Sequence, residues 1–176
     1  MGLNEVEYGI AVDDPSLPLR VSAGHIRLGV GTDRLTVSSS DPSDENLEGL
    51  RALADRVLEL LPHTPLRGTG VNFQWVERDP LPELLEVFRL PDNDSLADAG
   101  AVVGNTDLKR ALSLGDLPIN LSMRLNRDRE PEVLFDFNFH HPTQTAIQAR
   151  EHLNRGLVLL RETAQQLIRD AYDLEI

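Results

Sequence analysis

The segments LPINLSMRL (residues 117–125) and VLFDFNFH (residues 133–140) decide the fold, because apolar and polar side chains alternate through both. Successive side chains of a β-strand point to opposite faces of a sheet, so this alternation predicts two strands that are each apolar on one face. The short polar connector at 126–131 joins them. The pair therefore predicts an antiparallel hairpin whose apolar face needs a cover.

A third strand of the same kind is expected over residues 69–77. Val71, Phe73 and Trp75 occupy alternate positions there, with Asn72 and Gln74 between them. Weaker patterns predict strands over 5–12, 20–30 and 34–39. Turns are expected at 13–18, where two prolines and two aspartates occur, and at 31–33, where Gly31 begins a hairpin connection.

The first long helix is expected to begin near Asp41 and to end before Pro62. Asp41 is suited to an N-cap and Pro42 to the first helical position, and leucines then recur at helical spacing through Leu61. A short helix is expected between Pro80 and Pro91. Residues 92–104 show no clear period and are expected to form a loop, and 107–114 are expected to form another short helix.

The chain after Pro142 shows one apolar stripe at helical spacing. Its members are Ala146, Leu153, Leu157, Leu160, Ala164, Leu167, Ala171 and Leu174. From Leu153 the spacing alternates between four and three, which is a heptad pattern. Two interpretations are open: a helix packed across the sheet, or a coiled-coil contact with a partner. Gly156 is either a kink or a break between two helices.

Together these elements predict an α+β fold, as a single two-layer domain over residues 1–176. We expect an antiparallel sheet of about five or six strands, with helices on one face and a long C-terminal helix. The aromatic residues of the three best strands and the leucines of the helices would form the core.

The other face of that sheet is rich in amides and hydroxyls, with few of the lysines and glutamates typical of a solvated surface. An ordinary solvent-facing surface and a recognition face for a partner, a second copy or a small ligand are the two interpretations. The candidate interaction face comprises Asn72, Gln74, Asn120, Ser122, Arg124, Asp136, Asn138 and His140.

Composition excludes several classes of function. The chain of 176 residues has no cysteine, which excludes disulfides, cysteine-based zinc sites and thiol catalysis. A formal net charge of −12 argues against nucleic acid and anionic membranes as partners. No apolar run approaches a membrane span and the N-terminus lacks a signal-peptide pattern, so a cytoplasmic location is expected.

No motif indicates catalysis or cofactor binding, and no catalytic, cofactor-binding or metal-binding residue is predicted. The glycines at 68 and 70 precede a strand, whereas a phosphate loop lies between a strand and a helix. Asp136 and His140 share a face of one strand, and His25 could join them as a metal ligand if the strands were neighbours.

The favoured interpretation is a non-enzymatic protein-interaction module, namely a small acidic subunit, adaptor or assembly protein. It would act on a protein partner or by self-association, including a homodimer. The alternative is a small-molecule-binding or metal-dependent hydrolase-like domain with a site near His25, Asp136 and His140. A third possibility, an acidic mimic of nucleic acid, follows from the charge alone.

Overall fold

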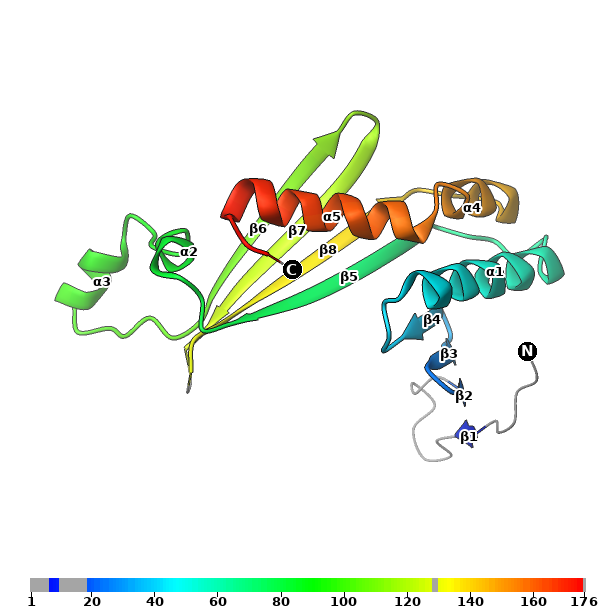
Figure 1. The fold of residues 1–176 in the computed structure, drawn as a ribbon, viewed down its shortest axis with the longest axis horizontal. Coiled ribbons are helices and arrows are strands. Elements are labelled where there is room, and N and C mark those ends of the chain that lie inside the picture. Colours follow the sequence, from blue (N-terminus) through cyan, green and yellow to red (C-terminus); the bar gives the residue numbers. More distant parts are fainter. Residues whose placement is uncertain (1–6, 10–18, 128–129, 176) are drawn as a thin grey trace. The chain divides into compact units, whose positions relative to one another are not determined.

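The computed structural model describes residues 7–9, 19–127 and 130–175. Within these ranges the chain forms eight strands, in two antiparallel four-stranded sheets, and five helices (Figure 1). The predicted α+β class, the antiparallel pairing and the C-terminal helix are confirmed. The strands are divided between two sheets, where one sheet of about five or six was expected. The turn expected at 13–18 lies outside the described residues.

The chain separates into two compact units, which are described one at a time. The first contains residues 1–67 and 143–159, and the second contains residues 68–142 and 160–176. The expectation of a single domain over the whole chain stays a prediction.

The sheet of the first unit is a meander of four strands in the order β1-β2-β3-β4. The strand expected over 20–30 is two strands, because Gly24 adopts a left-handed φ of +59° and turns the chain back. The strands are β1 (Glu7–Gly9), β2 (Leu19–Ala23), β3 (Ile26–Val30) and β4 (Leu35–Ser39).

Two helices complete the first unit, α1 (Asp44–Leu60) and α4 (Ala146–Leu153). Ser43 is the N-cap residue of α1, not Asp41 as expected. The Asp41 carboxylate instead accepts the backbone N–H of Ser43 at 2.9 Å, and this hydrogen bond lowers the pKa of Asp41. Helix α1 buries Leu47 and Leu50.

The sheet of the second unit has the order β5-β8-β7-β6. Its strands are β5 (Thr69–Arg78), β6 (Thr106–Leu114), β7 (Leu117–Asn126) and β8 (Glu132–His141). The helix predicted over 107–114 is wrong, since these residues form β6 and pair with β7 along its length. Gly115, at φ +60°, and Asp116 make the two-residue turn between them, so pairing of the hairpin strands overrides a weak helical spacing.

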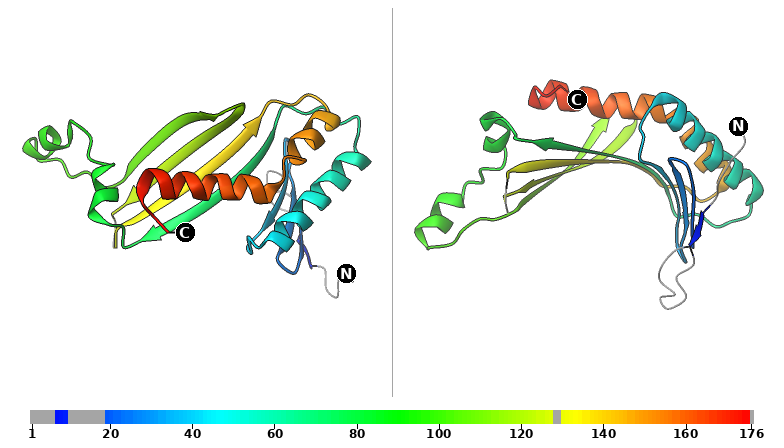
Figure 2. Two further views of the ribbon diagram at one scale, coloured as in Figure 1. Left: turned by 45° about the horizontal axis from the view of Figure 1, so that its top comes forward. Right: turned by 60° about the horizontal axis from the view of Figure 1, so that its bottom comes forward.

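One face of this second sheet is apolar and is covered by α5 (Leu157–Tyr172), which lies across it (Figure 2). We call it the covered face. Phe73 contacts Trp75 and Phe139, Trp75 contacts Phe137, and the Tyr172 ring of α5 lies 5.4 Å from that of Phe135. Fully buried side chains of the sheet are Ile119, Met123, Leu125, Val133, Phe135, Phe137 and Phe139.

The connection from β5 to β6 carries two short helices, α2 (Pro82–Glu86) and α3 (Asn93–Asp98). The short helix expected after Pro80 is present as α2 and buries Leu84; Phe88, which follows it, is fully buried. Part of the loop expected at 92–104 is helical, as α3, and none of the residues of this helix is buried.

Gly156 breaks the C-terminal region into α4 and α5, because its φ of +88° is left-handed. The heptad prediction is wrong at Leu167 and Ala171, which are half-buried and exposed, while Ile168 is buried in their place; the predicted Leu153, Leu157, Leu160, Ala164 and Leu174 are buried. The stripe follows the 3.6-residue period of a straight helix and packs inside the second unit. It is therefore not free to form the coiled coil considered above.

Replacing Phe139, which is fully buried, tests the importance of the covered face. Phe139→Ala is expected to lower the free energy of unfolding by about 3–5 kcal/mol, from lost burial and the cavity left behind. Urea unfolding followed by the fluorescence of Trp75 measures this change. Val76→Ala, on the opposite face, is the control and should change it by about 0.5 kcal/mol or less. Equal effects would contradict the assignment of the faces.

Gly156→Ala is expected to destabilise the chain by about 1–2 kcal/mol, since an L-residue is strained at this φ. A Cβ at residue 156 meets no atom within 4 Å, so the loss comes from the backbone alone. Gly104→Ala is the matched control, because its Cβ also meets nothing and its φ is not left-handed. Thermal unfolding of both variants makes the comparison. If Gly104→Ala lowers the stability as much as Gly156→Ala does, backbone strain at residue 156 is ruled out.

Candidate interaction face

All eight residues predicted for the interaction face lie on one face of the sheet of the second unit, opposite the covered face. We call it the open face. The strand register places Asn72, Asn138 and Asn120 side by side across β5, β8 and β7. The next row contains Gln74, Asp136 and Ser122. None of the eight side chains is buried.

The amides of the open face are paired across the strands. The Nδ2 of Asn138 donates to Oδ1 of Asn72 at 2.5 Å, and Nδ2 of Asn120 donates to Oδ1 of Asn138 at 3.2 Å. In the next row, Nε2 of Gln74 donates to Oδ2 of Asp136 at 3.1 Å. These bonds fix the orientation of side chains from three strands, so the face presents an ordered set of polar groups.

Arg124 connects the amide rows to the β6 edge. Its Nε donates to Oδ1 of Asp107 at 2.6 Å across the β6–β7 pair. This hydrogen bond, and then the carboxylate charge, raise the pKa of Arg124. Both side chains are about half exposed, so the pair orders the surface more than it stabilises the fold.

Sequence reasoning missed four charged residues of the open face. Asp107 and Lys109 were overlooked because β6 was expected to be a helix, although the Gly115-Asp116 dipeptide between apolar residues signalled a hairpin. Arg78 and Glu132 face each other where β5 and β8 end. The face thus carries three acids (Asp107, Glu132, Asp136) and three bases (Arg78, Lys109, Arg124).

The glycines at 68 and 70 make room for side chains of β8 on the open face. A Cβ at residue 68 would collide with the ring of His140, and one at residue 70 would lie 3.4 Å from Nδ2 of Asn138. The absence of side chains on this stretch of the β5 edge therefore lets the His140 ring lie beside the strand backbone. The close approach of the His140 ring gives Gly68 a structural reason that the sequence did not offer.

The structure does not support a metal centre at His25, Asp136 and His140. Asp136 and His140 share the open face on β8, and His25 lies in the β2–β3 turn. Within residues 7–9, 19–127 and 130–175, no three His, Cys, Asp or Glu side chains are placed to hold a metal ion. The alternative site near these residues thus gains no geometric support.

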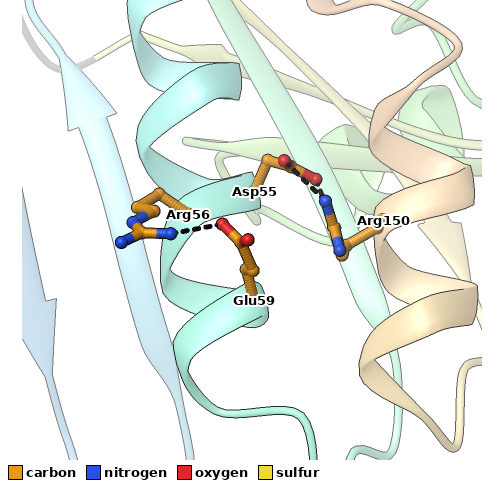
Figure 3. Close-up of polar contacts among 4 residues, drawn as sticks. All are labelled: Asp55, Arg56, Glu59 and Arg150. Carbon is orange, nitrogen blue, oxygen red and sulfur yellow. Dashed lines mark hydrogen bonds and ion pairs between the residues drawn. The ribbon is translucent and has the colours of Figure 1, made fainter.

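A second polar cluster, which the sequence did not reveal, joins α1 to α4 in the first unit (Figure 3). The Arg150 guanidinium donates from Nε to Oδ1 of Asp55 at 2.6 Å and from Nη2 to Oδ2 at 3.0 Å. This two-bond geometry lowers the pKa of Asp55 and raises that of Arg150. Arg56 and Glu59 form a separate pair on the surface of α1. We assign the Asp55–Arg150 cluster to helix packing.

Comparison with known proteins gives no relative from which a function could be taken. A scan of protein-family profiles, a search of curated proteins and a search of solved structures each returned no match. Among the residues that the structure describes, no helix is long and apolar enough to cross a membrane. The candidate interaction face is therefore supported only by its geometry in this structure.

The Asp55–Arg150 pair predicts a pH-dependent contribution to stability. Because folding lowers the pKa of Asp55, its contribution is fully present above the ordinary value of 3.8 and is lost as the pH falls through the lower folded-state pKa. Asp55→Asn is therefore expected to destabilise the chain at pH 7, and by progressively less below pH 3.8.

Urea titrations at several pH values measure this dependence. Asp94→Asn, which also removes one carboxylate paired with an arginine, is the control and should show little change at pH 7, because its pair with Arg89 is exposed. If Asp55→Asn lowers the free energy of unfolding equally at all pH values, the Asp55–Arg150 ion pair is not the source of the stability.

Proposed function

We propose that this chain is a non-enzymatic protein-interaction module that binds another polypeptide through the open face of the β5–β8–β7–β6 sheet. The observation that supports the proposal is the set of hydrogen bonds linking Asn72, Asn138 and Asn120 and linking Gln74 to Asp136. A small acidic subunit, adaptor or assembly protein would use such a surface.

The pairing lowers the cost of covering this face with a partner. A polar group that loses water without gaining a partner costs about 1–3 kcal/mol, and this cost normally opposes burial of a polar surface. Here the amide groups that lie between strands already have protein partners. A second polypeptide can therefore displace water from the face and leave few unpaired groups.

The side chains of the open face also lose little freedom when they are covered. Asparagine and serine have few rotatable bonds, whereas lysine and glutamate lose up to about 2 kcal/mol of rotamer entropy each. Lys109 and Glu132 are the only residues of those two types on the face. Arg124 is held by Asp107 in advance. An ordinary solvated sheet surface needs none of these features.

The proposal takes the partner to be a protein and not a nucleic acid or an anionic membrane, since the net charge of −12 repels both at long range. A cytoplasmic location belongs to the same proposal. Catalysis is not part of it, and no observation favours the hydrolase-like alternative.

The test uses a double variant, Arg124→Ala with Asn138→Ala, beside the wild type. Each protein is used as bait in extracts of the native host and, separately, against a differently tagged copy of the chain. The double variant lacks the Arg124–Asp107 pair and the central amide of the Asn72–Asn138–Asn120 row. Binding is expected to fall at least about tenfold, while the melting temperature changes by no more than about 2 °C.

Arg89→Ala with Gln166→Ala is the matched control. It removes an exposed arginine that pairs with Asp94 and an exposed amide of α5, neither of which lies on the open face. Binding should be retained by this control. A double variant that keeps full binding, or one that loses it only because it unfolds, would overturn the proposal.

A further inference from the structure

We infer that the occupant of the open face is a second copy of this chain, docked face to face about a two-fold axis. The inference rests on the proposed function and goes further by naming the partner. It is carried by the distribution of charge over the rows of the sheet.

Self-association of this chain must overcome its own charge. Two bodies of net charge −12 repel each other, and the repulsion is smallest where the facing surfaces are neutral. The open face is neutral, since its three acids and three bases cancel. The whole excess of negative charge therefore lies elsewhere on the chain. A second copy can approach this face without bringing like charges together.

The signs of charge on the two central strands are complementary. On the open face, β8 carries the acids Glu132 and Asp136, and β7 carries the base Arg124. A two-fold axis that runs along the boundary between these strands places β8 of one copy over β7 of the other. Such an interface is isologous, so each favourable contact occurs twice.

The strand register determines which residues meet in this arrangement. An axis parallel to the strands keeps each residue at its height along the strand, so residues that pair within one sheet also face each other between copies. Asn138 of one copy therefore lies over Asn120 of the other, and Asp136 lies over Ser122. Arg124 lies over Leu134, beside the row of Asp136. Lys109 of β6 lies over Gln74 of β5. No row places a charge over one of the same sign.

The size of the open face suits a dimer. Four strands of about ten residues, at about 4.8 Å spacing and 3.4 Å per residue, give a face of roughly 650 Å² per copy. Both copies together then bury about 1,300 Å², within the range of about 1,200–2,000 Å² for specific interfaces. Val76, which is 49% exposed, and the half-buried Leu134 pair with each other and supply apolar contact on the face.

Sedimentation equilibrium of the whole chain tests the inference. We expect the wild type to reach twice the 19.6 kDa of one chain as concentration rises. Because copies of like net charge repel, association should tighten when salt is raised from about 20 to about 150 mM. Arg124→Glu should weaken it at least about tenfold, because it places another acid between the rows of Glu132 and Asp136 of the facing β8.

Arg89→Glu is the control for Arg124→Glu. The two arginines are 59% and 56% exposed, each pairs with one aspartate, and each substitution changes the net charge equally. Only Arg124 lies on the open face. A mixture of Arg124→Glu with Asp136→Arg should recover the dimer, because the reversed charges then meet across the axis.

Three outcomes would overturn the inference: a wild type that stays monomeric up to about 0.5 mM, beyond the range of a specific dimer; a dimer that Arg124→Glu leaves intact; or equal weakening by Arg89→Glu. These outcomes are separate from failure of the proposed function. A monomeric wild type that captures a different protein, and loses it in the Arg124→Ala and Asn138→Ala variant, would refute the homodimer and keep the interaction module.

Discussion

Burial of the aromatic side chains of β5 and β8 beneath α5 is the constraint on which the second unit depends. Phe135, Phe137 and Phe139 are essentially inaccessible to solvent, and Tyr172 of α5 packs against Phe135. In a strand, every second residue must then point to the other face. The positions of Asp136, Asn138 and His140 are thus consequences of the core, because a register shift of one residue would expose the phenylalanines.

That constraint also explains how polar residues from distant parts of the chain come together. Asn72 and Asn138 are far apart in sequence, yet they are direct neighbours because β5 pairs with β8 along its whole length. The buried side chains of the covered face fix the strands that carry the Asn72–Asn138–Asn120 row. A side-chain network in which each member is fixed by its neighbours is a better recognition surface than freely rotating side chains, because it loses little conformational entropy on binding.

Sequence reasoning found the three strands with strict alternation, and with them the side of the sheet on which each candidate residue lies. It failed where local pattern and tertiary pairing disagree. Residues 107–114 have leucines at helical spacing, but β7 pairs with them as a strand, which hid Asp107 and Lys109. The heptad spacing runs through the break at Gly156, and α5 keeps the 3.6-residue period of a straight helix, so it buries Ile168 and not Leu167. The order of strands, and hence the pairing of Asn72 with Asn138, has no local signature.

The topology of the second sheet has a consequence for how it folds. The hairpins β6–β7 and β7–β8 join strands that are adjacent in sequence, so little chain entropy opposes their closure. β5 is different, since even its nearest pair with β8, Arg78 with Glu132, closes a loop that contains α2, α3, β6 and β7. The meander of β6, β7 and β8 can assemble from local contacts, whereas addition of β5 carries the larger cost in chain entropy. Until that step, the edge of β8 and one side of its phenylalanines stay open, so a newly made chain is most prone to misassembly there.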